Sequence, residues 1–339
     1  MENKLRVCLI GCGRAGMIHA RNYKNKIDRA RITAVADAFA DAVEAAAKEL
    51  GVSKCFTDYH DILNDPEIDA VIVVAPTNLH CEIVVDCANA GKHIFCEKPM
   101  AMTVEECDRM IAVCEKNNVK LQVGFMRRFD ASFQEAKRLV EAGEIGDLVQ
   151  IHSNTRGPSK PRPWMYDIKK SNGILAEVNS HDIDAVRWIA GSDIRTVYAL
   201  AGNFRNPEAK ADYPDYYDSV LMTGTLDSGV HFCIDGAAYS QYGYDSKMEI
   251  IGTKGKIQVG RSDQKFVHCT TTEHGTSTPF IESWQTLFLD AYLQEDLSFV
   301  SAILDGTDVP VTGKDGREAV AVVEAGNHSI TEGIVKTVR

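Results

Sequence analysis

Apolar positions in the first 125 residues alternate between short strand-like runs and longer stretches with helical spacing. Each strand-like run precedes an amphipathic segment, and the runs read LRVCLIG, ITAVAD, AVIVVAP, HIFCEKP and LQVGF. Two of the amphipathic segments, residues 38–50 and 103–118, have clear helical periodicity. The second opens with the capping-box pair Thr103 and Glu106. Strands and helices that alternate in this way predict a parallel sheet.

The pattern changes after residue 125. We expect one more helix over residues 129–142, then a strand-like VQIHSNT and a loop rich in proline and basic residues, RGPSKPRPW. Beyond residue 195, alternating apolar stretches joined by Asp-Ser-Gly and Thr-Lys-Gly turns predict an antiparallel sheet, and helical periodicity returns in the last 50 residues. The sequence therefore predicts an α/β domain over residues 1–125 and an α+β domain over residues 126–339.

Composition narrows the class of protein. A chain of 339 residues is long enough for two domains, and no apolar run approaches the roughly 20 residues that span a bilayer. The apolar stretch near the N-terminus is six residues long and leads into glycines, unlike a signal peptide. The net charge of -11 argues against a nucleic-acid partner, because such binding needs a basic surface. We expect a protein with a small-molecule ligand.

The ten cysteines include no CxxC pair and lack the spacing of a zinc finger. In a chain of this length without a secretion signal, they are best explained as buried thiols of a reducing compartment. We therefore expect a cytoplasmic protein without a bound metal.

A GxGxxG motif lies directly after the run LRVCLI and directly before a helical stretch, MIHARNY. In such a motif the first glycine allows a tight turn, the second lets backbone amides approach a pyrophosphate, and the third lets the helix meet the strand closely. The N-terminus of the helix then faces the phosphates. The sequence predicts a Rossmann domain whose dinucleotide loop contains Gly11, Gly13, Arg14, Ala15 and Gly16.

Asp37 ends the second predicted strand, 21 residues after Gly16, where a carboxylate would hold the ribose hydroxyls. Its charge would repel a 2′-phosphate, and no Arg or Lys follows within ten residues to offset it. NAD is therefore favoured over NADP. The alternative is that Asp37 only caps the following helix.

Lys98 lies in the sequence Glu97-Lys98-Pro99, directly after the run HIFC. The proline keeps Lys98 out of the α region, so we expect its side chain to project from the end of a strand, where ligands bind in open α/β sheets. A partly desolvated lysine beside a nicotinamide ring can take part in proton transfer or hold the substrate oxygen. The alternative is a solvated surface lysine.

Residues 171–191 are predicted to form one helix that ends at Gly191. Glu177, His181 and Asp184 stand at positions i, i+4 and i+7, so all three should point from one face. An imidazole between two carboxylates is suited to act as a general base for a hydroxyl near neutral pH. A solvated polar face and a zinc site are the alternatives.

Segments spread over nearly the whole chain carry a resemblance to a known family, and they read GCGRAG, AVAD, AVIVVAPTNLH, HIFCEKPMA, LQVGFMRRFD, SHDIDAVRW and YGYDSKMEIIGTKG. They resemble the glucose-fructose oxidoreductase, inositol dehydrogenase and MocA family, and within it the inositol 2-dehydrogenases. This resemblance implies a Rossmann domain followed by an α+β domain with a large, mostly antiparallel open sheet. It also implies a homo-oligomer, a tetramer or a dimer, assembled through that sheet.

The resemblance implies hydride transfer to NAD from a secondary hydroxyl of a cyclic polyol or sugar. Lys98 and His181 match the catalytic positions, where His181 would accept the hydroxyl proton and Lys98 would position that oxygen. Glu177 stands where inositol dehydrogenases usually have Asp and would orient or relay protons, while Asp184 would bind a substrate hydroxyl or steady His181. We expect all four to meet beside the nicotinamide.

Further pocket residues follow from the same resemblance. The nicotinamide side is expected to be flanked by Pro76, Thr77, Asn78 and His80, and the cofactor site to include Glu97 and Lys98. Candidates for contact with substrate or cofactor are Arg127, Arg156, Tyr242 and Tyr244.

Three positions leave the identity of the substrate undecided between an inositol and a sugar. Glu177 adds a methylene, and Thr155 and Gly157 stand where inositol dehydrogenases carry larger polar side chains. With Trp164 in the adjacent loop, the pocket would also suit a pyranose or glycoside oxidised at one ring hydroxyl. Two other functions remain as alternatives, namely a redox-neutral glycosidase that uses bound NAD transiently and an NAD-sensing regulator without turnover.

Overall fold

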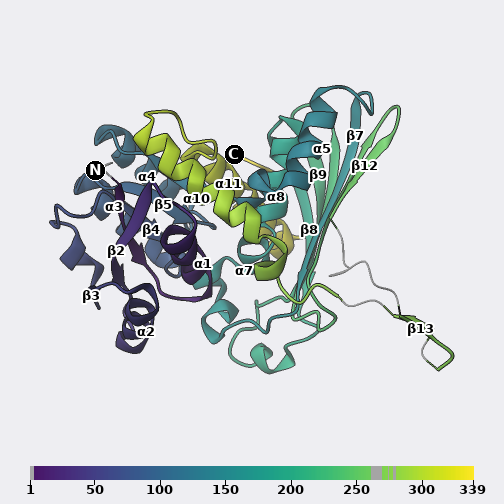
Figure 1. Cartoon of the computed structure of the whole chain (residues 1–339). Coiled ribbons are helices and arrows are strands. Elements are labelled where there is room, and N and C mark those ends of the chain that lie inside the picture. Colours follow the sequence, from purple (N-terminus) through teal and green to yellow (C-terminus); the bar gives the residue numbers. More distant parts are fainter. Residues whose placement is uncertain (1–3, 261–268, 274, 278–279) are drawn as a thin grey trace. The chain divides into compact units, whose positions relative to one another are not determined.

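The computed structural model describes residues 4–260, 269–273, 275–277 and 280–339. The chain forms two compact units, which Figure 1 colours along the sequence. The first unit contains the chain up to Phe129 together with Leu289–Val320, and the second contains Asp130–Phe288 together with Ala321–Arg339. Among the described residues, no helix has both the length and the apolar character needed to cross a membrane.

The first unit is built on a six-stranded sheet in which every pair of neighbours is parallel. This confirms the predicted parallel sheet, and the strand order 3-2-1-4-5-6 is that of a Rossmann fold. In spatial order the strands are β3 (Lys54–Phe56), β2 (Ala30–Ala36), β1 (Leu5–Ile10), β4 (Ala70–Val73), β5 (His93–Glu97) and β6 (Leu121–Gly124).

Within the described residues, five complete helices and part of a sixth belong to the first unit. They are α1 (Arg14–Asn25), α2 (Ala40–Leu50), α3 (Thr77–Asn89), α4 (Val104–Lys116), α10 (Leu289–Leu304) and the first part of α11 (Gly313–Glu332). The predicted cap of α4 is present, because Thr103 Oγ1 accepts a hydrogen bond from Glu106 N at 3.1 Å. Short 3-10 turns are η1 (Tyr59–Ile62) and η2 (Met126–Phe129).

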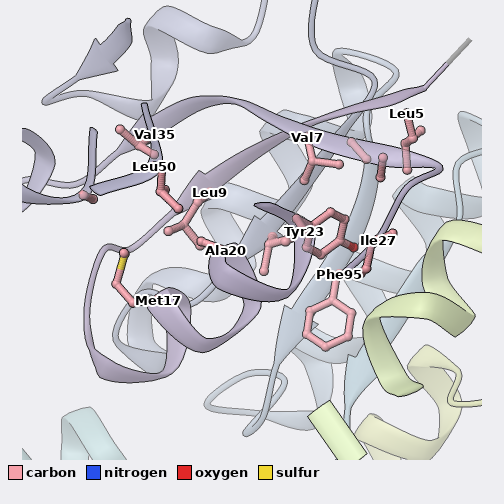
Figure 2. Close-up of a cluster of buried hydrophobic side chains, with 14 of the residues drawn as sticks. Leu5, Val7, Leu9, Met17, Ala20, Tyr23, Ile27, Val35, Leu50 and Phe95 are labelled. Atoms are coloured by element: carbon pink, nitrogen blue, oxygen red, sulfur yellow. The ribbon is translucent and has the colours of Figure 1, made fainter. Parts of the chain in front are cut away.

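A buried apolar cluster holds α1 against the sheet (Figure 2). Alternate residues of β1, including Val7 and Leu9, join a row on α1 that includes Met17, Ala20 and Tyr23. Burying an apolar side chain of this size contributes about 1.5–3 kcal/mol, so packing fixes where α1 starts. The glycine loop between β1 and α1 is therefore held at both ends.

Helix α10 corrects the predicted division of the chain at residue 126. The sequence places residues 289–320 in the second domain, whereas the structure assigns them to the first unit. The reason is that α10 packs on α1 and the sheet, with the ring of Phe299 at 5.8 Å from that of Phe95 in a T-shaped contact. Its periodicity predicts a buried face but not the surface that buries it.

The second unit contains a sheet of seven described strands, and among these only β7 and β10 run parallel, which confirms the mostly antiparallel prediction. In spatial order the strands are β12 (Lys256–Val259), β11 (Asp245–Gly252), β7 (Leu148–Gly157), β10 (His231–Ala238), β9 (Ser219–Leu226), β8 (Ile194–Gly202) and β15 (Lys336–Thr337). A separate two-stranded ribbon pairs β13 (Cys269–Thr271) with β14 (Gly275–Ser277).

Helices cover one face of this sheet (Figure 1). Along β7, Ile151, Ser153 and Thr155 are buried on this covered face, whereas the alternating residues, such as His152 and Asn154, lie on the open face. The helices of the second unit are α5 (Ala131–Glu141), α6 (Ile168–Ser171), α7 (Gly173–Glu177), α8 (Ser180–Ala190), α9 (Trp284–Leu287) and the last part of α11, and its 3-10 turns are η3 (Pro163–Tyr166) and η4 (Pro207–Lys210).

Candidate active site

The glycine loop has the shape that a pyrophosphate needs. Gly11 has φ +101°, and a Cβ there would lie 2.5 Å from Val74 O, while a Cβ at Gly16 would collide with Gly11 O. At Gly13, in contrast, a Cβ would meet nothing within 4 Å. Packing therefore requires glycine at positions 11 and 16, whereas Gly13 leaves open space in front of the backbone.

The N-terminus of α1 faces this open space without a competing anion. Gly13 is the N-cap residue, no side chain caps the helix, and its first turn contains no acidic residue. Arg14 and Ala15 occupy the first two helical positions, and neither is buried. Free amides and the helix dipole make such an end a site for phosphate, so this loop fits NAD.

Asp37 lies at the end of β2 and is oriented by two backbone amides. One carboxylate oxygen accepts a hydrogen bond from Cys12 N at 2.7 Å, and the other accepts from Phe39 N at 3.0 Å. Helix α2 itself has no side-chain cap, so helix capping does not account for Asp37. Each oxygen keeps a second lone pair with which to accept a ribose hydroxyl.

The segment after β4 supplies the next part of the same edge. Pro76 is the N-cap residue of α3, Thr77 is buried, and Asn78 is exposed. His80 is buried, with its ring nitrogens 2.9 Å from Pro99 O and 2.7 Å from Ala75 O. Burial lowers the pKa of His80, and a neutral ring donates a hydrogen bond to one of these two carbonyls.

Lys98 follows β5 directly and is half-buried, with a cis peptide bond to Pro99. Its backbone N–H donates to Glu97 Oε2 at 3.0 Å. Since β5 is parallel to β1, β2 and β4, Lys98 lies on the edge of the sheet that also carries the glycine loop and Asp37. The structure therefore brings the predicted cofactor residues and the predicted lysine to one edge of the first unit.

Glu97 and Arg127 have different surroundings from those that the sequence predicts. Both are buried in the first unit, with only 6% of Glu97 and 1% of Arg127 exposed. The Glu97 carboxylate contacts His19 and the backbone of Lys98. Arg127 lies in η2, shortly after β6. The predicted contacts of these two side chains with cofactor or substrate stay predictions.

The prediction of one helix over residues 171–191 is wrong, because Val178 and Asn179 separate α7 from α8. Asn179 is fully buried, and its amide donates to Asp235 O on β10 at 3.3 Å. The neighbouring Gly236 leaves the necessary room, since a Cβ there would collide with Asn179 Oδ1. The predicted end of the helix is confirmed, with Gly191 in the left-handed conformation.

This break changes the predicted polar face. His181 and Asp184 lie on α8, at positions i and i+3, and only 7% and 1% of them are exposed. Glu177 is half-buried at the end of α7, across the break. Helix α8 is tied to the covered face of the sheet by Asp182, which accepts from Ser153 Oγ at 2.5 Å. A solvated helix face is therefore excluded for His181 and Asp184.

Arg156 forms an ion-paired cluster on the other side of strand β7. Its guanidinium contacts Asp235 at 2.8 Å and Asp245 at 3.1 Å, and the hydrogen bonds to Asp235 raise its pKa. Tyr242, which is 41% exposed, also bonds to it, while Tyr244 is buried. By strand alternation Arg156 lies on the face opposite to α8 and Thr155. Its predicted contact with substrate stays a prediction.

Two side chains near the cofactor edge of the first unit belong to no sequence motif, so no sequence pattern selects them as candidates. His19 lies three residues after Gly16 and is fully buried, and Phe39 lies two residues after Asp37 and is 75% exposed. The sequence feature that could have selected His19 is a titratable side chain on the buried side of α1. For Phe39, it is a large aromatic residue in an alanine-rich segment.

Comparison with known proteins agrees with this architecture. Residues 5–125 match the family model of GFO/IDH/MocA oxidoreductases with an NAD-binding Rossmann fold, and residues 133–258 match the GFO/IDH/MocA C-terminal domain. The myo-inositol 2-dehydrogenase of Thermotoga maritima is 35% identical, and the alignment covers 97% of each chain. The scyllo-inositol 2-dehydrogenase (NAD(+)) of Bacillus subtilis is 34% identical, with 98% of this chain and 96% of the relative covered.

Solved structures extend the likeness to the whole fold. The scyllo-inositol dehydrogenase of Lactobacillus casei, crystallised with NAD(H) and scyllo-inositol, superposes with a TM-score of 0.90 at 31% identity, covering 99% of each chain. The likeness therefore covers both the Rossmann sheet and the second sheet of this chain. The chain belongs to the GFO/IDH/MocA family of oxidoreductases and is an NAD-dependent dehydrogenase.

Proposed function

We propose that this dehydrogenase oxidises one secondary ring hydroxyl of an inositol or a closely related cyclic polyol. The observation that carries the proposal is the position of Lys98 at the carboxyl edge of the parallel sheet, beside the glycine loop and Asp37. The relatives named above act on inositols and match almost the full length of the chain.

The first unit would hold NAD, which supplies the hydride acceptor. The amides at the start of α1 would bind the pyrophosphate, with Gly13 leaving space for its approach. Asp37, already oriented by Cys12 N and Phe39 N, would accept hydrogen bonds from the ribose hydroxyls and disfavour a 2′-phosphate.

Lys98 and His181 would handle the substrate hydroxyl. In the oxidation the carbinol carbon loses a hydride and the hydroxyl loses a proton, so that a ketone forms. A ring nitrogen of His181 would accept the proton, and the Lys98 ammonium would donate a hydrogen bond to the same oxygen as negative charge develops on it. Asp184, one turn along α8, would orient the imidazole, and Glu177 would relay the proton onward.

A substrate panel with purified protein and NAD tests this function. We expect NADH formation with myo-inositol or scyllo-inositol, and a loss of at least about a hundredfold in kcat for Lys98→Ala and for His181→Ala. Lys120→Ala and His328→Ala are matched controls, because Lys120 is partly exposed, His328 is exposed, and each contacts an exposed carboxylate. Near-normal turnover in either test variant would refute its catalytic assignment.

Aldoses and aryl glycosides in the same panel separate the alternative functions. NADH formed from a free sugar or glycoside, but from no inositol, would move the substrate to a pyranose. Release of the aryl group without net NADH would indicate a redox-neutral glycosidase. NAD binding without turnover of any compound would favour an NAD-sensing regulator over an enzyme.

We also propose that the protein is a homo-oligomer, a dimer or a tetramer, formed through the open face of the seven-stranded sheet. Leu200 and Leu221 are directly paired in neighbouring strands, and 55% and 47% of them are exposed. Paired exposed leucines on a sheet face are typical of a surface that a partner covers.

A reducing compartment such as the cytoplasm is the proposed location. All nine cysteines whose side chains the structure describes are free thiols, and six of them are buried. Burial raises the pKa of Cys87 and of Cys114 to about 12, so these thiols stay protonated and unreactive near neutral pH.

A further inference from the structure

The buried side chain of His19 bridges two carboxylates inside the first unit. Its Nδ1 lies 2.7 Å from Asp296 Oδ1, and its Nε2 lies 3.1 Å from Glu97 Oε1. His19 and Asp296 are fully buried, and Glu97 is 6% exposed. The three residues come from α1, α10 and the end of β5, so one imidazole joins three elements around the cofactor edge.

Both contacts require a proton between nitrogen and oxygen. An ionised carboxylate can only accept hydrogen bonds, so a ring that donates to Asp296 and Glu97 together must be an imidazolium. Burial alone would lower the pKa of His19, but Asp296 and Glu97 overcome this effect and raise it well above the ordinary value. The cluster of one imidazolium and two carboxylates then has a net charge of about -1.

The rest of the cluster is closely defined. Asn22 donates to the second oxygen of Asp296 at 2.9 Å, which leaves His19 facing the first. The rings of Phe95 and Tyr292 flank the imidazole, with centroids at 4.9 Å and 5.3 Å. Buried ionic groups are weak contributors to stability when compared with apolar residues of the same size. What this cluster provides is a fixed orientation for each of its members.

The Glu97 carboxylate carries this orientation to Lys98. Its Oε1 contacts His19, and its Oε2 accepts a hydrogen bond from Lys98 N at 3.0 Å. On the neighbouring strand, Gly124 is paired with Glu97, and a Cβ at Gly124 would come within 3.0 Å of the carboxyl carbon. Glycine at this position leaves space for the carboxylate to lie in the plane that satisfies both partners.

We propose that His19 is a positioning residue for the reaction, because it holds the Glu97 carboxylate and, through it, the backbone from which Lys98 projects. Since His19 lies three residues after Gly16, the same ring connects the cofactor helix to the lysine by a continuous hydrogen-bonded path. The inference rests on the proposed role of Lys98 in the oxidation.

A double-mutant cycle tests whether His19 acts through Lys98. Glutamine fills a similar volume, but it is uncharged and carries both of its N–H donors on one nitrogen, so it cannot bridge Asp296 and Glu97 as the two ring nitrogens of His19 do. We therefore expect His19→Gln to lower kcat about tenfold or more while the KM for NAD changes less than about threefold. In a Lys98→Ala background, His19→Gln should cause no further loss of kcat. Independent losses that multiply in the double variant would overturn the proposal.

A conservative variant separates positioning from simple loss of packing. Glu97→Gln keeps an oxygen that can accept from Lys98 N and an amide that can donate to a neutral His19, so it should retain much more activity than Glu97→Leu. Equal losses in the two variants would contradict a positioning role. As a control, His93→Gln changes a half-buried histidine at the opposite end of β5 and should leave kcat unchanged.

Chemical labelling gives a readout that needs no substrate. Trace acetylation followed by mass spectrometry would compare the reactivity of the Lys98 amine with that of Lys116, which is exposed on α4. We expect the ratio of the two rates to change at least about threefold in Glu97→Leu and in His19→Gln, as a displaced side chain changes its exposure. An unchanged ratio in folded variants would overturn the inference. If the wild-type protein oxidises no polyol, the proposed function fails while this ratio still decides the role of His19.

Discussion

We expect Asp37 to set the preference for NAD over NADP through the charge of its carboxylate. Its two oxygens accept from Cys12 N and Phe39 N. A serine there would remove the charge that repels a 2′-phosphate and would leave one shorter, uncharged acceptor for the ribose in place of two carboxylate oxygens. We expect Asp37→Ser to raise the KM for NAD and to shift the ratio of kcat/KM for NADP over NAD by about tenfold or more, which is near 1.4 kcal/mol. Steady-state kinetics with both cofactors measures this shift.

A second aspartate serves as the control. Asp41 is exposed in the first turn of α2, so Asp41→Ser should leave the ratio of cofactors near its wild-type value. An unchanged ratio in Asp37→Ser would show that another group excludes the 2′-phosphate.

At the scale of residues, the sequence predicts what depends on near neighbours. Gly11, Gly13 and Asp37 are recognisable because their spacing and the strands before them define a local geometry. The partner of His19 is Asp296, which lies 277 positions away along the chain, so no local pattern identifies it. For the same reason, Glu97 is predicted as a cofactor contact although its carboxylate points to His19.

The interruption between α7 and α8 shows how a single side chain overrides helical periodicity. The amide of Asn179 donates to Asp182 Oδ2 at 2.8 Å and to Asp235 O at 3.3 Å. Replacing it leaves the buried Asp182 with one donor fewer, so we expect Asn179→Ala to lower the free energy of unfolding by about 2 kcal/mol. Urea denaturation followed by circular dichroism measures the change.

An asparagine at the surface provides the comparison. Asn89 is exposed at the end of α3, so Asn89→Ala should change the free energy of unfolding by less than about 0.5 kcal/mol. Equal unfolding midpoints for Asn179→Ala and wild type would mean that the break is held by other contacts.

At the scale of elements, periodicity locates helices well but their ends less reliably. The predicted helix over residues 129–142 agrees with α5, and Gly191 ends α8 as expected. Glu177, His181 and Asp184 stand at positions i, i+4 and i+7, which is the pattern of one continuous helix. The contact of Asn179 with β10 depends on residues more than fifty positions later, and it is this contact that divides the segment.

At the scale of the molecule, the course of the chain is harder to predict than its sheets. Both sheets are predicted from the local pattern of apolar and polar residues. The strands of the first sheet are separated by helical segments, and several strands of the second are joined by turns. Residues 289–320 return to the first unit, because α10 fills the space beside α1 and Phe95. An amphipathic helix near the end of a chain shows that a face is buried without naming the surface that covers it.

The open face of the seven-stranded sheet predicts how copies of the chain associate. Leu200 and Leu221 are neighbours there, and burying both against a partner would contribute several kcal/mol at about 1.5–3 kcal/mol for each side chain. We expect the wild-type protein to be a dimer or a tetramer by size-exclusion chromatography with light scattering. The double variant Leu200→Glu with Leu221→Glu should dissociate toward monomer, because a glutamate in a closed interface is left without a partner.

Leu304→Glu is the matched control, since Leu304 is 37% exposed at the end of α10 in the first unit. It should keep the wild-type mass. Far-ultraviolet circular dichroism of the double variant should match that of the wild type, because both substituted side chains project from the open face and leave the covered face unchanged. A monomeric wild type, or a double variant that assembles normally, would move the association surface away from this sheet, and the paired leucines would then be ordinary exposed apolar residues.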